Sequence, residues 1–193
     1  MCQKEEKESQ EMKQIADIPK TGQLYKNVSP IALELTTCTV LAIDPSIGSS
    51  SSAPGWAVYT PKGLYKSGTI DTGGSHLPLW KRARKLADEI KSLCEDFGPE
   101  VLVYEDIPAS SGFNANAQAS LLKAVGIVLA SSDTEVCLGI HPASWKNYVR
   151  PTYTKGDEED AIEIGWVAIE LARHIRKGAA TSSTKRTRRS VQD

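Results

Sequence analysis

An apolar run that ends in a carboxylate is the feature that most constrains the fold. Residues 38–44, Cys-Thr-Val-Leu-Ala-Ile-Asp, are largely β-branched or apolar up to Asp44, and Pro45 follows. Such a run is typical of a strand that is buried on both faces of a sheet. Because proline cannot donate to the ladder, Asp44 is predicted to be the last residue of the strand. A carboxylate is rarely placed beside a core unless it is paired or binds metal, so Asp44 is a candidate functional residue.

The elements that follow define the fold class. Apolar and alternating runs predict strands at 55–60, 63–70, 101–105 and 135–140. Helical periodicity predicts helices at 79–97, 116–130 and 157–175, with a short helical stretch around Trp145. Three meandering strands followed by alternating helices and strands predict an α/β fold, in which a mixed sheet carries helices on both faces.

Carboxylates at the ends of two buried strands point to one site. Asp44 ends the first strand, and Glu105 ends the strand at 101–105. If these strands are neighbours with level ends, both carboxylates face one crevice at the edge of the sheet. Two close carboxylates raise each other's pKa unless a cation lies between them. We therefore expect further ligands and a metal ion.

The start of the final helix supplies more carboxylates, in the sequence Asp157-Glu158-Glu159-Asp160. Asp157 and Asp160 are three residues apart, so they share one helical face, and the helix N-terminus stabilises them. A shift of the helix start would bring Glu158 or Glu159 into the site instead. Taken singly, the acids have ordinary explanations, because Asp-Pro is common in turns and acidic residues commonly begin helices.

Four carboxylates of this kind predict a hard divalent cation. Mg²⁺ and Mn²⁺ prefer oxygen ligands, so the predicted catalytic and metal-binding residues are Asp44, Glu105, Asp157 and Asp160. Two such ions about 3.5–4 Å apart activate water and stabilise the leaving oxygen in phosphodiester hydrolysis. We expect two Mg²⁺ ions per site, with Mn²⁺ as a working substitute.

Composition and length limit the alternatives. The chain has 193 residues, of which 40% are hydrophobic and 24% charged, so a soluble domain with a real core is expected. No stretch reaches the roughly 18 apolar residues of a membrane span, and the first residues do not form a secretion signal. We expect a soluble, intracellular protein with no membrane partner. The cysteines are scattered without a C-x-x-C pair, which indicates neither a zinc knuckle nor a disulfide framework.

The two ends of the chain differ from its middle. Residues 1–36 are rich in Lys, Glu and Gln and are predicted to form a flexible or loosely helical extension. Residues 37–177 are predicted to form the folded catalytic domain, and 178–193 a disordered basic tail. The net charge is −1, but the tail carries Lys185, Arg186, Arg188 and Arg189. We expect these residues to bind DNA phosphates, although a basic end can also serve solubility alone.

The order of the motifs resembles one family of nucleases. The segments concerned are Ile43–Ser46, Gly55–Val58, Val103–Glu105 and Asp157–Ala161. They resemble the Asp, Glu, Asp-x-x-Asp-Ala series of the RuvC-type Holliday junction resolvases, over about residues 40–172. The resemblance implies a ribonuclease H-like fold, a homodimer, a four-way DNA junction as substrate, and the four acids named above as metal ligands.

The resemblance also implies DNA contacts away from the acids. Residues 113–126 are similar to the loop and helix that enter the junction and pack against the second subunit, which makes Phe113 a candidate base-stacking wedge, with ordinary loop packing as the alternative. Three basic residues are placed similarly to those near the scissile phosphate: Lys146, Arg150 and Lys155. Ser46 stands where the family often has glycine, within a longer serine-rich loop, so the chain resembles a viral or bacteriophage member.

These observations predict a structure-selective endonuclease for Holliday junctions or other branched DNA, acting in recombination, repair or DNA processing. The alternatives are a flap-cutting or packaging nuclease of the same fold and a branched-DNA-binding protein without activity. An actin-like or sugar-kinase-like protein also opens with an acid-bearing strand and a hairpin. However, phosphate-cradling glycines do not follow the later strands of this chain.

Overall fold

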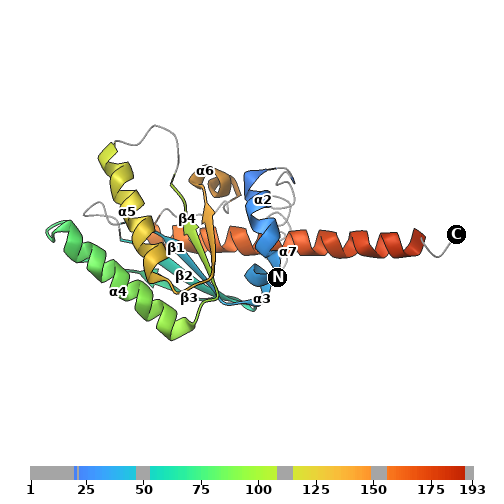
Figure 1. Cartoon of the computed structure of the whole chain (residues 1–193), viewed down its shortest axis with the longest axis horizontal. Helices are drawn as coiled ribbons and strands as arrows, with labels where there is room; N and C mark the ends of the chain where they lie inside the picture. Colours follow the sequence, from blue (N-terminus) through green and yellow to red (C-terminus); the bar gives the residue numbers. More distant parts are fainter. Residues whose placement is uncertain (1–19, 21, 47–52, 108–114, 149–155, 190–193) are drawn as a thin grey trace, which may run out of the picture.

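A five-stranded sheet lies at the centre of the structure (Figure 1). The computed structural model describes residues 20, 22–46, 53–107, 115–148 and 156–189. The strands are β1 (Val40–Asp44), β2 (Gly55–Thr60), β3 (Gly63–Thr69), β4 (Val101–Glu105) and β5 (Val136–Ile140). The helices are α2 (Gln23–Val28), η1 (Ser29–Ile31), α3 (Ala32–Thr37), α4 (Leu79–Phe97), α5 (Ala115–Ser131), α6 (Pro142–Trp145), η2 (Lys146–Tyr148) and α7 (Asp157–Arg189).

The sheet is mixed, with the strand order β3-β2-β1-β4-β5. β1, β2 and β3 pair antiparallel, and the turn at 61–62 joins β2 to β3, whereas β4 and β5 pair parallel to their neighbours and are reached through helices. The predicted strands and the predicted α/β class are confirmed. The first strand is shorter than expected, because residues 38 and 39 precede the ladder.

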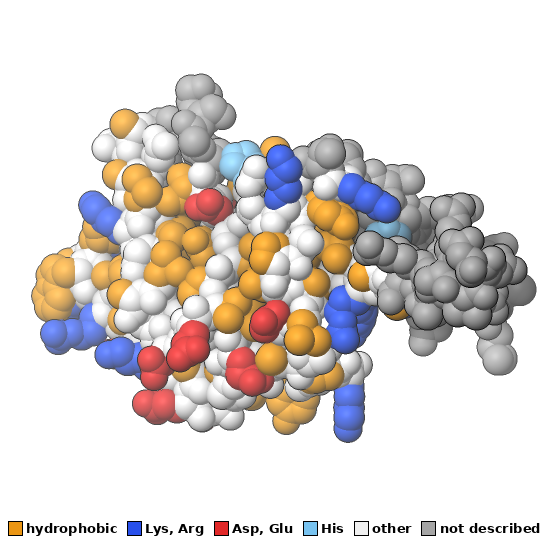
Figure 2. Space-filling model, turned by 45° about the vertical axis from the view of Figure 1, so that its right-hand side comes forward, with side chains coloured by type: hydrophobic (Ala, Val, Ile, Leu, Met, Phe, Trp, Pro, Cys, Tyr) orange, Lys and Arg blue, Asp and Glu red, His pale blue; other side chains and the backbone are white. Residues whose placement is uncertain are grey.

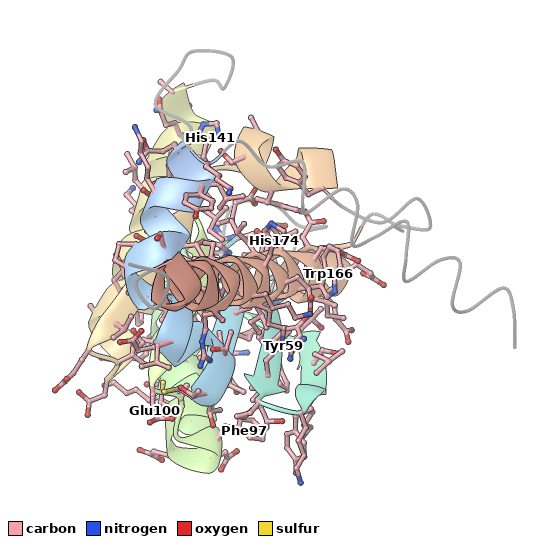
Figure 3. The ribbon with its side chains drawn as sticks, turned by 90° about the vertical axis from the view of Figure 1, so that its right-hand side faces the viewer. Tyr59, Phe97, Glu100, His141, Trp166 and His174 are labelled. Atoms are coloured by element: carbon pink, nitrogen blue, oxygen red, sulfur yellow. The ribbon has the colours of Figure 1, made fainter. Side chains whose placement is uncertain are left out.

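Helices cover both faces of the sheet, as predicted. Side chains alternate along a strand, so Val40 and Ala42 of β1 face one layer, while Leu41 and Ile43 face the other. α7, α2 and α3 pack on the first face, and α4 and α5 on the second (Figures 1 and 3). Asp44 continues the row of Val40 and Ala42, so its side chain lies on the face that α7 covers.

A glycine allows α7 to approach the sheet closely. A Cβ atom on Gly165 would lie 2.5 Å from the ring of Tyr59 and 2.9 Å from the Cβ of Ala42. The Tyr59 hydroxyl also donates a 2.6 Å hydrogen bond to the carbonyl of Ile162. Figure 3 looks along α7 and shows Tyr59 beside this helix. These contacts hold the helix in a defined position over β1 and β2.

The N-terminal region that the structure describes is helical. Residues 23–37 form α2, η1 and α3, and residues 1–36 were predicted to be a flexible or loosely helical extension. Leu24, Val28, Ala32 and Leu35 are buried in the same core as α7. These four residues are spaced as one helical stripe, which the surrounding polar residues made hard to recognise. They are buried because α7 and β5 expose an apolar surface that needs cover.

The final helix is longer than predicted. α7 continues to Arg189, through residues expected to form a disordered tail, and Figure 1 shows its end projecting beyond the rest of the molecule. No proline interrupts residues 176–189, and Ala, Lys and Arg favour helix. Neither α7 nor any other helix that the structure describes is long and apolar enough to cross a membrane.

Candidate metal centre

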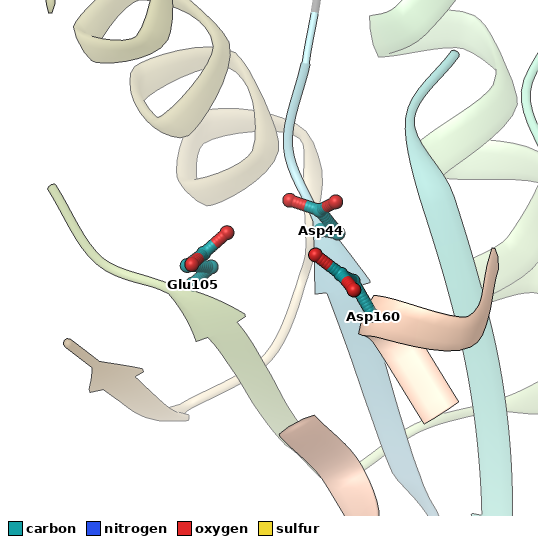
Figure 4. Close-up of side chains that lie close together, drawn as sticks. All are labelled: Asp44, Glu105 and Asp160. Atoms are coloured by element: carbon teal, nitrogen blue, oxygen red, sulfur yellow. The ribbon is translucent and has the colours of Figure 1, made fainter. Parts of the chain in front are cut away.

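Three carboxylates from three elements converge at the C-terminal end of β1. Asp44, Glu105 and Asp160 each offer an oxygen, and these oxygens all lie within 4.8 Å of one another (Figure 4). Asp44 is the most deeply placed of them, with 7% of its surface exposed. The arrangement could hold a metal ion.

Strand register brings the first two acids together. β1 and β4 are parallel neighbours, and Ile43 lies opposite Tyr104. Asp44 and Glu105 therefore follow at the same level, with both side chains on the α7 face. The prediction that these two strands are adjacent with level ends is confirmed.

A second glycine allows the third acid to reach the site. Gly55 pairs with Asp44 across β1 and β2, and a Cβ atom on Gly55 would lie 1.6 Å from the carbonyl oxygen of Asp157. The first turn of α7 therefore rests directly on the backbone of β2. Asp160, three residues further along, reaches Asp44. The sequence showed a glycine after the serine-rich loop, but nothing in its pattern indicated this helix contact.

The other acids of the first turn of α7 have different surroundings. The carboxylate of Asp157 accepts a 2.9 Å hydrogen bond from the backbone N–H of Ala53 and lies outside the group of three. Glu158 accepts a 2.6 Å hydrogen bond from the Ser67 hydroxyl, and the carboxylate of Glu159 lies beside Gly156. The structure thus gathers three of the four predicted ligands and places Asp157 next to them.

Burial and mutual repulsion change the proton affinity of the cluster. Burial, followed by the carboxylate of Glu105, raises the pKa of Asp44 to about 9, and Asp160 and Asp157 add to the effect. Burial also raises the pKa of Asp160, while the ammonium of Lys146 opposes that rise. In the metal-free protein, Asp44 therefore carries a proton at neutral pH. This agrees with the expectation that such carboxylates require a cation.

The residues present fit a divalent cation. Among the residues that the structure describes, the buried Oε1 of Glu105 and Oδ1 of Asp160 accept no hydrogen bond, although the ammonium of Lys146 lies 3.5 Å from the former. Buried polar atoms that accept no hydrogen bond are costly, and a bound cation would satisfy both of them. The donor set consists of carboxylate oxygens alone, which suits a hard ion such as Mg²⁺ or Mn²⁺.

One predicted basic residue lies at the acids themselves. The Nζ atom of Lys146 is 3.5 Å from Oε1 of Glu105 and 3.8 Å from Oδ2 of Asp160. It also lies 5.0 Å from the ring centre of Trp145, which is completely buried and anchors the end of α6. The Lys146 side chain is 48% exposed, so its ammonium can reach solvent or a ligand.

The other predicted DNA-binding residues lie outside the described residues or are described by their backbone alone. Phe113, Arg150 and Lys155 lie outside the described residues. The backbone of α7 includes the four basic positions Lys185, Arg186, Arg188 and Arg189, whose side chains are not described. On the face shown in Figure 2, Lys and Arg side chains lie near the place where α7 leaves the body, and acidic side chains gather towards the lower edge.

The sheet order, the covering helices and the acids at the ends of β1 and β4 define a ribonuclease H-like fold. The fold is that of the RuvC-type Holliday junction resolvases, which confirms at the level of the fold the resemblance found in the sequence.

Two solved structures carry this comparison. RuvC of T. thermophilus, in complex with a Holliday junction substrate, is similar with a TM-score of 0.53 and 15% identity, over 70% of this chain and 95% of that one. The yeast mitochondrial Holliday junction resolvase Ydc2 is similar with a TM-score of 0.53 and 14% identity, over 88% of this chain and 96% of that one. The chain matches no protein-family model and no curated protein sequence.

Proposed function

We propose that this protein is a metal-dependent endonuclease that hydrolyses phosphodiesters in Holliday junctions or other branched DNA, in recombination, repair or DNA processing. The observation that carries the proposal is the convergence of Asp44, Glu105 and Asp160 at the sheet end of a RuvC-type fold. Such a site requires deprotonated carboxylates fixed on rigid elements, and two of the three acids end buried strands.

The carboxylates and Lys146 would have different roles in catalysis. Two Mg²⁺ or Mn²⁺ ions held by the carboxylates would polarise the phosphodiester and supply a hydroxide at neutral pH. Asp44 would bind such an ion as a carboxylate, so metal binding would release the proton that burial holds on Asp44. Asp157 stays beside the site and holds the backbone of Ala53. Lys146 can turn from the acids towards the non-bridging oxygens of the scissile phosphate.

The proposed substrate also suggests how the protein assembles and where it binds DNA. A four-way junction has two related strands to cut, and two symmetric nicks are most simply made by a homodimer. The basic end of α7 would bind the phosphates of a DNA arm.

The test is cleavage of a synthetic four-way junction labelled on each strand in turn, with Mg²⁺. Paired, symmetric nicks are expected in the wild type, and Asp44→Asn should remove them while junction binding persists. Asp88→Asn, at an exposed position on α4, is the matched control and should cleave normally.

Two outcomes would overturn the proposal. Equal cutting of linear duplex, flap and junction at matched salt would favour a general nuclease of this fold. Tight junction binding in Mg²⁺ without turnover, unchanged in Asp160→Asn, would favour a protein that only binds branched DNA.

A further inference from the structure

A cavity of about 430 Å³ lies between α2, α6 and the ends of β4 and β5. Its volume is in the range of about 300–1,000 Å³ that is typical of small-ligand sites. Asp106, which lines the cavity, directly follows Glu105 in the chain. The cavity therefore lies at the same end of the sheet as the acids.

The polar groups of α2 present both a donor and an acceptor. Gln23 donates a 2.6 Å hydrogen bond from its amide nitrogen to the amide oxygen of Asn27. This bond leaves the carbonyl oxygen of Gln23 and the amide N–H groups of Asn27 for a ligand. Such a pair matches the hydrogen-bonding edge of a nucleobase, which also places donors and acceptors side by side.

Two further groups are held in place by the backbone. Asp106 uses one carboxylate oxygen to accept a 2.8 Å hydrogen bond from the N–H of Ile107, and its own N–H donates to the carbonyl of Ile140 at 2.9 Å. The other carboxylate oxygen of Asp106 can therefore accept a hydrogen bond from a ligand. His141 accepts a 3.2 Å hydrogen bond from Ala143 through Nδ1, so the neutral ring carries its proton on Nε2.

The charge of the residues that line the cavity limits which ligands can bind there. Asp106 is the charged residue of the lining, and neither Lys nor Arg is among the described residues that form it. A phosphate would therefore be repelled, whereas an uncharged base would be accepted. Leu24, Ile107 and Ile140 supply apolar surface for a flat ring.

We infer that this cavity receives an unpaired DNA base next to the scissile phosphate, and that Asp106 selects a base with an exocyclic amino group. Cytosine, adenine and guanine each carry such a donor, whereas thymine has no amino group and its exocyclic oxygens, O2 and O4, can only accept hydrogen bonds. Unpaired bases at a branch point cost little free energy to unstack, so they can enter such a cavity. The inference rests on the proposed function.

Cleavage of four matched junctions tests the inference, with cytosine, adenine, guanine or thymine placed in turn at each nucleotide flanking the cut. At one of these positions the wild type should cut the thymine junction roughly tenfold more slowly than the others. Asp106→Asn should reduce that ratio to about one, because an amide can donate to a thymine carbonyl. Asp133→Asn, at an exposed position before β5, is the control and should keep the wild-type ratio. Equal cutting of all four junctions by the wild type, or an unchanged ratio in Asp106→Asn, would overturn the inference.

A binding measurement separates this inference from the proposed function. A junction with 2-aminopurine at the same position should gain fluorescence when Asp44→Asn protein binds it, because the base leaves the stack. Asn27→Leu, added to Asp44→Asn, should remove most of the gain while the affinity for the junction changes little. If no branched DNA is cut, the proposed function fails, and this signal still decides whether the cavity takes a base. Junction binding without any gain would overturn the cavity's role.

Discussion

The ammonium of Lys146 lies 3.5 Å from Oε1 of Glu105, so a positive charge already stands at the carboxylates that would hold a metal ion. Lys146 begins η2, which follows directly on α6, and Glu105 ends β4, so the contact joins elements that are separated by α5 and β5 in the chain. The ammonium and a divalent cation would repel each other at this distance.

Replacing Lys146 with methionine is expected to strengthen metal binding and weaken catalysis. Removing the competing charge should lower the Kd for Mn²⁺ roughly fivefold, about 1 kcal/mol, in the absence of DNA. Junction cleavage should nevertheless fall, because the scissile phosphate loses a cationic partner. Calorimetric Mn²⁺ titration and single-turnover cleavage measure the two effects. Unchanged Mn²⁺ affinity would show that the ammonium turns away from the acids in solution.

The metal-free protein is expected to lose stability as the pH rises. The pKa of Asp44 is about 9 in the folded state and near 3.8 when exposed, so the folded state holds the extra proton between these values. The free energy of unfolding therefore falls from about pH 4 to about pH 9. The Tm measured in chelator should decrease over that range in the wild type and less steeply in Asp44→Asn. Parallel curves for the two proteins would contradict the raised pKa.

Asp160 is expected to matter more for metal binding than Asp157. Asp160 contributes an oxygen to the group of three, whereas Asp157 holds the backbone of Ala53 and contributes charge nearby. Asp160→Asn should weaken Mn²⁺ binding at least about tenfold, and Asp157→Asn by less. Glu159→Gln is the control on the same helical turn and should bind Mn²⁺ as the wild type does. A larger loss in Asp157→Asn would mean that the loaded site differs from this arrangement.

Removal of residues 178–193 is expected to weaken DNA binding and flatten its dependence on salt. The segment carries four basic residues, so the slope of log K against log salt should fall in magnitude by up to roughly 3.6. Metal-dependent hydrolysis should persist, because the acids lie at the other end of α7. Fluorescence anisotropy at several salt concentrations measures the slope. The same slope in both proteins would remove DNA binding from the functions of this segment.

The N-terminal helices are expected to contribute to the stability of the fold. Leu35 is 2% exposed and Leu33 is 56% exposed on the same short helix, so they form a matched pair. Leu35→Ala should lower the free energy of unfolding by about 2–4 kcal/mol, and Leu33→Ala by less than about 0.5 kcal/mol. Urea unfolding followed by circular dichroism measures both. Equal effects would indicate that α3 does not pack as described.

The main elements of the fold could be predicted because their signals are local. Alternating and apolar runs identified β1 to β5, and helical periodicity identified α4 and α5. The signals at the two ends were weaker. The apolar stripe of α2 and α3 is short and lies among polar residues, and the end of α7 carries no stop signal. Whether such segments become helical depends on the surface that they meet, which no local pattern records.

The sequence by itself determined that Asp44 and Glu105 end buried strands, because strand length and proline position are encoded locally. Tertiary structure decided which further groups join them. The pairing of β1 with β4 placed Asp44 and Glu105 at the same level. Because Gly55 has no side chain, α7 lies close to β2, and Asp160 rather than Asp157 joins the two acids. The position of Lys146 and the cavity at Asp106 likewise depend on contacts between distant segments. Such contacts arise from packing between elements, and packing is a property of the assembled fold.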